Sequence, residues 1–265
     1  MTEELDLDLT QEEQPRRWRF DWILPTFLRP RRTFVQIAEQ EKPAWLLPML
    51  LLSLLILINI LVVGPVRREA ALMNMSGELP PGYEWWLPEE QARYQETISK
   101  SAGFFSIYVT PLLGSLGGLW IAWFLLGSIL HLGLTLGGSR SSNTSALNLT
   151  AWASLPLGVR ILVQTIAVLA SRSLVKTPGL SGFAAAEPAG FSAFLAALLA
   201  LIDIYLIWQF VLLLVGVVPM AGIARGKAWI ITAIVFLLIL ALRALPGFIG
   251  MQLSGLNTGG GFFYF

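Results

Sequence analysis

Five long apolar stretches constrain this chain more than any other feature of its sequence. They cover approximately residues 44–64, 104–136, 146–170, 191–218 and 228–250. Each is at least as long as the ~20 residues that an α-helix needs to cross the hydrocarbon core of a bilayer. Because backbone groups inside lipid must bond to one another within their own segment, we expect all five to be helical. The sequence therefore predicts an all-α membrane protein, a bundle of about five transmembrane helices.

The composition agrees with a membrane protein and excludes several functions. Hydrophobic residues make up 55% of the chain and charged residues 13%, about half the ~25% charge of soluble domains. Cysteine is absent, which excludes disulfides, thiolate metal sites and cysteine nucleophiles. A net charge of +1 gives no reason to expect nucleic-acid binding.

The segments outside the apolar stretches divide the chain into four parts. Residues 1–15 are acidic and aperiodic, which predicts a disordered tail. Residues 16–43 form a basic interfacial segment, residues 44–250 the five-helix membrane domain, and residues 251–265 a short aromatic tail. The acidic start is the opposite of the basic start of a cleavable signal peptide, so the first span is expected to direct membrane insertion.

The basic segment before the first span has the pattern of an amphipathic helix. Pro30 suits the first helical position, and Phe34, Ile37 and Ala38 would then share one face. This pattern favours an N-terminal interfacial amphipathic helix whose apolar side enters the headgroup region; a solvated basic linker is the alternative. The expected membrane-surface side chains are Arg29, Arg31, Arg32, Trp18 and Trp22.

The distribution of Lys and Arg predicts the orientation of the chain. With the N-terminus in the cytoplasm, ten bases lie on the inner side and six on the outer side. Since cytoplasmic loops carry the excess of Lys and Arg, we expect a cytoplasmic N-terminus and an external C-terminus.

Three charged residues within the apolar stretches are the candidate functional residues. Asp203, Arg160 and Arg243 fall at similar depth in three different spans. A lone charge at mid-membrane costs ~3 kcal/mol, so we expect Asp203 to pair with Arg160 or Arg243. Gln164 and Gln209 could bond into the same cluster. The cluster is either an ion pair that fixes helix packing or a polar site for an ion, a proton or an anionic headgroup.

A stripe of small residues marks the second span. Gly114, Gly118 and Ala122 recur at four-residue spacing, and Gly133 and Gly137 repeat that spacing. Small residues at this spacing allow another helix to approach closely. We expect this stripe to pack inside the bundle rather than to form a dimer seam.

Known catalytic patterns do not fit this sequence. The run GIARGK at residues 222–227 is shorter than a phosphate-binding loop and follows a membrane helix instead of a strand. The run GLSG at residues 179–182 lies far from the sole histidine, His131, so no Ser–His pair is expected. A metal site needs several ligands, and one histidine without cysteine does not supply them. The sequence predicts no enzyme, no cofactor and no metal.

Three stretches of the chain share their pattern and order with a known group of membrane proteins. The stretches are residues 30–37 (PRRTFVQI) with 42–48 (KPAWLLP), residues 137–139 with 151–156 (AWASLP), and residues 202–208 (IDIYLIW) with 222–228 (GIARGKA). Together they resemble the Yip family, membrane proteins named for interaction with Ypt/Rab GTPases, and in particular its prokaryotic members. Asp203 and Trp208 match the family's fourth-span pattern, and Lys227 matches its final hairpin. The resemblance implies five helices, a cytoplasmic N-terminus and an external C-terminus. The acidic motifs of eukaryotic members are missing before the first span, so the resemblance gives no support for Rab GTPase binding.

The resemblance and the missing catalytic groups together favour a non-enzymatic protein of a bacterial or archaeal plasma membrane. It would organise the membrane or assist another protein by binding the lipid bilayer and a membrane-protein partner or a second copy of itself. The alternative is a small transporter or channel subunit that uses Asp203, Arg160 and Arg243.

Overall fold

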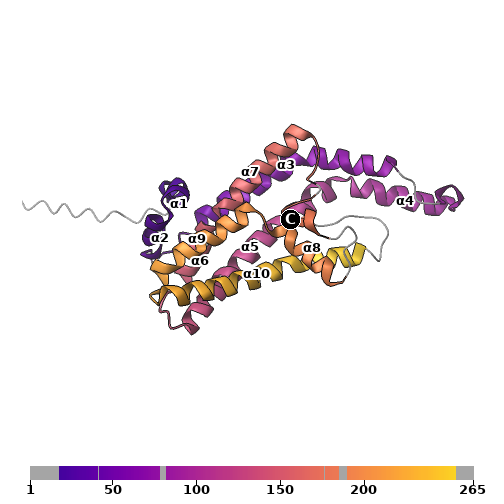
Figure 1. The fold of residues 1–265 in the computed structure, drawn as a ribbon. Helices are drawn as coiled ribbons and strands as arrows, with labels where there is room; N and C mark the ends of the chain where they lie inside the picture. The colour runs from indigo at the N-terminus through magenta and orange to yellow at the C-terminus, as the bar shows by residue number, and fades with distance from the viewer. Residues whose placement is uncertain (1–17, 41, 78–81, 176, 185–189, 255–265) are drawn as a thin grey trace, which may run out of the picture.

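A computed structural model describes residues 18–40, 42–77, 82–175, 177–184 and 190–254. The described chain is helical, and Figure 1 shows long helices running side by side along one bundle. The predicted disordered tail at residues 1–15 and most of the predicted aromatic tail at residues 251–265 lie outside the described residues.

Five segments of the described chain are long and apolar enough to cross a membrane, which confirms the predicted number of spans. They are α3 (Leu46–Gly77), η3 with α5 (Phe105–Val109 and Thr110–Leu136), α6 with α7 (Asn143–Ala153 and Leu155–Ser171), α9 (Ile204–Ala221) and α10 (Arg225–Ser254). The segment η3 is a π-helical turn that leads directly into α5.

The predicted fourth span at residues 191–218 is wrong in its extent, because the structure divides it. Helix α8 (Phe191–Leu201) ends before Asp203, and α9 begins at Ile204. Asp203 has extended backbone angles, and its carboxylate accepts a hydrogen bond from the N–H of Leu206 at 2.9 Å. This is an N-cap, which satisfies a backbone donor that would otherwise be unpaired in an apolar setting.

The predicted interfacial helix forms, but its apolar face does not lie in the headgroup region. The chain enters through η1 (Phe20–Trp22), α1 (Ile23–Leu28) and α2 (Pro30–Ala38), with Pro30 in the first turn as expected. Phe34 and Ile37 are each only 1% exposed, because α2 packs against α9 and α6. The apolar stripe therefore meets protein instead of lipid.

A close helix approach fixes α2 against the bundle. A Cβ atom added at Gly216 in α9 would meet the ring of Phe34 and the side chain of Leu149. The two side chains occupy the space that only glycine leaves open. Thus α2 belongs to the main hydrophobic core, together with Leu130, Leu134, Leu213 and Val217, which are fully buried.

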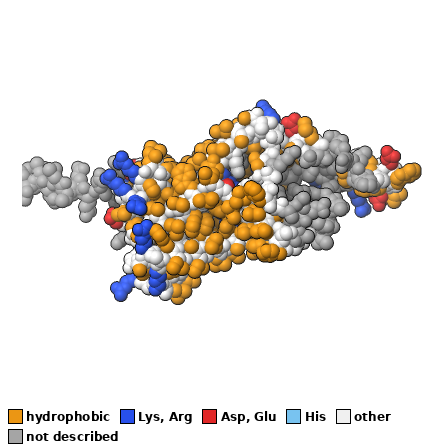
Figure 2. Space-filling view, in the orientation of Figure 1, with side chains coloured by type: hydrophobic (Ala, Val, Ile, Leu, Met, Phe, Trp, Pro, Cys, Tyr) orange, Lys and Arg blue, Asp and Glu red, His pale blue; other side chains and the backbone are white. Residues whose placement is uncertain are grey.

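The two ends of the bundle differ in charge and in shape. The basic end, as we name it here, carries seven exposed cations among the described residues: Arg29, Arg31, Arg32, Lys42, Arg140, Arg225 and Lys227. Figure 2 shows blue side chains gathered at the end where α1 and α2 lie. At the opposite end, the last turns of α3 and the helix α4 (Pro88–Ser101) extend beyond the other helices (Figure 1). We name this the α4 end.

Candidate functional site: a polar cluster inside the bundle and a pocket at its edge

The break before α9 brings the acid and one base of the predicted cluster together. The Nε atom of Arg160, on α7, lies 3.0 Å from the second carboxylate oxygen of Asp203, and the two side chains are 14% and 16% exposed. The first carboxylate oxygen bonds to the N–H of Leu206. One oxygen of the Asp203 carboxylate therefore caps α9, and the other pairs with Arg160 of α7. The carboxylate links the two helices.

A second polar contact joins the same two regions. The Nε2 atom of Gln209 donates to the Oγ of Ser154 at 2.9 Å, and this Oγ donates to the carbonyl of Thr150 at 2.7 Å. Since Ser154 has one hydroxyl hydrogen and has given it to Thr150, the amide of Gln209 must present its NH₂ group to Ser154. Its Oε1 atom is buried without a partner among the described residues.

Arg243, on α10, completes the cluster without an ion pair. No acid of the described chain lies within 4.0 Å of it, although it interacts electrostatically with both Asp203 and Arg160. Arg243 and Gln209 line a small cavity with Ser154 and Ala122. The cavity volume is about 30 Å³, room for about two water molecules. A water there can accept from Arg243 and donate to the orphaned Oε1 of Gln209.

Gln164 does not join this cluster. It is half-buried on α7 and forms no hydrogen bond with any described residue. A different polar contact lies one position further along: the amide of Asn59 donates to the hydroxyl of Thr165 at 2.7 Å. Sequence reasoning missed this link between α3 and α7, and a lone Asn in an apolar span was the available signal.

Asn148 and Trp152 form another junction that the sequence analysis missed. The side-chain oxygen of Asn148 accepts from the N–H of Ala44, its NH₂ donates to the carbonyl of Lys42, and Trp152 donates to the carbonyl of Ala44. These bonds satisfy the backbone just before α3 begins. They hold the start of the first span against α6.

The small-residue stripe of α5 is only partly inside the bundle. Gly118 is exposed, and a Cβ atom added there would meet nothing within 4 Å, so the predicted internal packing is wrong at this position. Gly114 is half-buried, and Ala122 faces the small cavity. The close approach instead occurs further along α5, where the side chain of Ile231 in α10 packs against Gly133 and Gly137.

The predicted membrane-surface residues divide into two groups. Arg29, Arg31 and Arg32 are exposed, and Trp18 is 46% exposed. Trp22 is only 2% exposed, because its ring packs edge-on against Trp152 with centroids 5.5 Å apart. Trp22 is therefore a core residue, which corrects the surface position expected for it.

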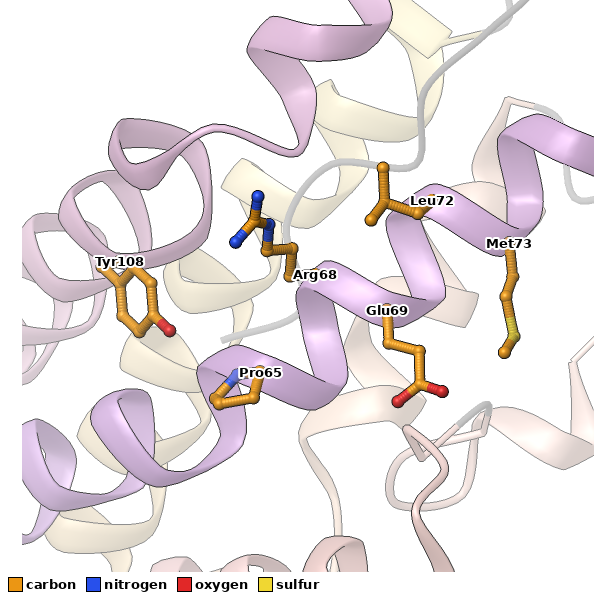
Figure 3. A pocket seen from close by; sticks show the side chains of 6 residues that line it. All are labelled: Pro65, Arg68, Glu69, Leu72, Met73 and Tyr108. Carbon is orange, nitrogen blue, oxygen red and sulfur yellow. The ribbon is translucent and has the colours of Figure 1, made fainter.

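A larger pocket lies at the edge of the bundle, between the end of α3 and η3. Figure 3 shows its lining, which is Pro65, Arg68, Glu69, Leu72, Met73 and Tyr108. Its volume is about 680 Å³, within the ~300–1,000 Å³ typical of small-molecule sites. The sequence alone does not indicate this α3–η3 pocket, because its two walls come from different spans.

Few groups in the described chain could carry chemistry. No three or more His, Asp or Glu side chains of the described residues are close enough to hold a metal. The Nδ1 atom of His131 is buried without a hydrogen-bond partner among the described residues. The polar cluster can hold helices together and accommodate water, and the α3–η3 pocket can admit a ligand.

Comparison with known proteins places the chain in a family. The Yip1 domain matches residues 25–245, which includes the described helices α2 to α9. A similar protein is membrane protein YknW of Bacillus subtilis, 27% identical over 212 residues that cover 79% of this chain and 84% of that relative. No solved structure matches. The chain is therefore a multi-pass helical membrane protein that belongs to the Yip1 domain family.

Proposed function

We propose that this protein is a non-enzymatic membrane organiser or accessory protein that binds partner membrane proteins or lipids. We place it in a bacterial plasma membrane with the basic end in the cytoplasm. The excess of Lys and Arg at that end supports this orientation. The bacterial source of a similar protein supports the type of cell.

The observation that carries the proposal is the way in which the basic end is built. Arg29, Arg31 and Arg32 are exposed on helices whose opposite side, at Phe34 and Ile37, is buried in the bundle core. The backbone that carries these cations is therefore held in place against the bundle, and we place it at the membrane surface. Such a surface attracts anionic headgroups or an acidic segment of a partner, at about 1 kcal/mol per cation.

The interior of the bundle supports the same proposal. The carboxylate of Asp203 already pairs with Arg160 and caps α9, and the cavity beside Arg243 has a volume of about 30 Å³. A transport site for a small molecule needs roughly ten times that volume. The accessible features of the described chain lie at its two ends.

The test is purification in mild detergent with native lipid, followed by mass spectrometry of co-purifying protein and lipid. We expect a stoichiometric partner or an enriched anionic lipid with the parent chain. It should be lost from the triple variant Arg29→Gln, Arg31→Gln, Arg32→Gln. The matched control, Arg93→Gln, Lys100→Gln and Arg172→Gln, removes the same charge elsewhere and should retain it. Equal loss in both variants, or retention in the first, would contradict the proposal.

A second candidate function, a small transporter or channel subunit, rests on one observation. Arg243 has no paired acid and the Oε1 of Gln209 has no partner within the described residues, so the cluster retains capacity for a small ion. Flux of a small inorganic ion into proteoliposomes that stops in the Asp203→Asn variant would favour this function. Equal flux with the variant and with empty liposomes would exclude it.

A further inference from the structure

The α3–η3 pocket is formed along one continuous face of α3. Pro65, Arg68, Glu69, Leu72 and Met73 recur at spacings of three and four residues, which places them on one side of a helix. Tyr108 closes the pocket from η3. Figure 3 shows Arg68 and Tyr108 reaching into the space between the two elements, while Glu69 leaves α3 on its other flank.

The ring of Tyr108 forms one wall of the pocket and has contacts on two sides. A Cβ atom added at Gly64 would meet the Tyr108 ring, so the ring lies directly against the backbone of α3. The ring of Phe104 also contacts it, with centroids 5.2 Å apart. Tyr108 belongs to a π-helical turn, a form that often occurs at functional sites. The pocket thus has a defined wall rather than a chance gap between helices.

The depth of the pocket follows from the length of α3. Pro65 comes nineteen residues after Leu46, where α3 begins. At ~1.5 Å per residue this is about 29 Å, the thickness of the hydrocarbon core. An upright α3 that enters the hydrocarbon core at Leu46 would place the pocket from Pro65 to Met73 at the level of the lipid headgroups, at the α4 end.

The pocket carries one charge of each sign, and neither is used within the described protein. Arg68 and Glu69 are exposed, and neither lies within 4.0 Å of an opposite charge of any described residue. A guanidinium and a phenol hydroxyl together suit a phosphate, since both donate hydrogen bonds to its oxygens. The carboxylate of Glu69 suits an ammonium. Pro65 and Leu72 offer apolar surface for the glycerol and the first methylene groups.

We propose that the α3–η3 pocket binds the headgroup of a phospholipid that carries both a phosphate and a primary ammonium, as phosphatidylethanolamine does. Arg68 and Tyr108 hold the phosphate on one flank of α3, and the exposed side chain of Glu69, which lines the same pocket, turns toward it to hold the ammonium. A phosphatidylglycerol headgroup has no cation for Glu69, and a phosphatidylcholine headgroup has no N–H to donate to it. This inference deepens the lipid-binding part of the proposed function and names the lipid class.

The experiment is native mass spectrometry of the full chain in detergent with one defined lipid at a time. The probes are phosphatidylethanolamine, phosphatidylcholine, phosphatidylglycerol and the soluble headgroup glycerophosphoethanolamine. We expect phosphatidylethanolamine to be retained best. The Arg68→Gln variant should lower its occupancy about tenfold, because a hydrogen-bonded charge is removed. The control Arg93→Gln, on α4, should leave it unchanged.

Glu69→Gln should remove the preference for phosphatidylethanolamine over phosphatidylglycerol while phosphate binding persists. Tyr108→Phe keeps the ring and removes one donor, so it should weaken retention even if Arg68→Gln folds poorly. Equal retention of the three lipids by the parent chain, or equal effects of Arg68→Gln and Arg93→Gln, would overturn the proposal. Retention of the soluble headgroup as strong as that of the lipid would overturn the lipid as its source. These outcomes do not depend on Arg29, Arg31 and Arg32, so failure here is distinguishable from failure of the proposed function.

Discussion

At the basic end of the bundle, the aromatic side chains of Trp22 and Phe34 lie inside the protein, whereas at the α4 end the side chain of Trp85 lies outside it. Trp22 and Phe34 are 2% and 1% exposed, but Trp85 is 88% exposed. Both ends have charged and aromatic residues next to an apolar stretch. The difference shows that such a sequence places a segment at the membrane surface but does not decide whether its apolar side meets lipid or protein.

The difference arises because a neighbouring helix covers the apolar side chains at one end and not at the other. At the basic end, Gly216 leaves a hollow on α9 that the ring of Phe34 fills. At the α4 end, the last turns of α3 extend past the other helices, and one face from Pro65 to Met73 lines an open pocket. A packed end fixes the positions of its charges, and an open end leaves space for a ligand.

The largest expected effect comes from opening the packed end. Phe34→Ala removes a buried ring from the core and should lower the free energy of unfolding by about 3–5 kcal/mol. The control Val35→Ala changes the next residue, which is 43% exposed, and should cost less than about 1 kcal/mol. Thermal unfolding of both variants in detergent checks this. Similar losses of stability would mean that α2 is not packed on α9.

Variants of the Asp203–Arg160 ion pair test whether the polar cluster stabilises the fold. Asp203→Asn keeps a side chain that can cap α9 but leaves Arg160 without its counter-charge, which should cost about 3 kcal/mol. Adding Arg160→Met should recover most of that loss, since the arginine that lost its counter-charge is then removed as well. Thermal midpoints of the single and double variants give the answer. A double variant as unstable as the single one would show that the pair is not what stabilises this junction.

Substitution of one glycine at each end allows the packing of the two ends to be compared directly. A Cβ atom at Gly216 meets Phe34 and Leu149 in the core, and one at Gly64 meets Tyr108 beside the α3–η3 pocket. Gly216→Ala should cost about 1–3 kcal/mol because Phe34 has no free space to enter. Gly64→Ala should cost less than about 1 kcal/mol, because the half-exposed Tyr108 can turn into the pocket. Stability measurements with the order reversed would contradict the comparison.

The smallest effect is expected on α4. The ammonium of Lys100 lies 2.7 Å from the carboxylate of Glu96, and this hydrogen bond and charge hold the pKa of Glu96 below its ordinary value. A lowered pKa adds stability above the pKa of the unfolded chain, and that stability is lost as the pH falls below about 4. Since both side chains are well exposed, Glu96→Gln should shift the thermal midpoint by less than about 1 °C at pH 7. A larger shift would mean that α4 is held more firmly than its exposure indicates.

Much of the fold follows from the sequence, because length and hydropathy alone define the five spans. A pair between Asp203 and either Arg160 or Arg243 also follows, since a charge in lipid needs a partner, but the sequence does not show that the partner is Arg160. The division between α8 and α9 was missed because residues 191–218 are apolar almost throughout, although Asp203 before Ile204 has the pattern of an N-cap. The α3–η3 pocket was not predictable, because it depends on where Tyr108 of one span meets Gly64 of another.

Accessibility of single cysteines tests the contrast between the two ends most directly, because the parent chain has no cysteine. A membrane-impermeant maleimide would be added to intact cells and to opened cells that carry Glu69→Cys, Arg31→Cys or Ile37→Cys. We predict labelling of Glu69→Cys in intact cells, labelling of Arg31→Cys only after the cells are opened, and no labelling of Ile37→Cys in either. Labelling of Ile37→Cys as fast as Arg31→Cys, or protection of Glu69→Cys in intact cells, would contradict a packed basic end and an open pocket at the external surface.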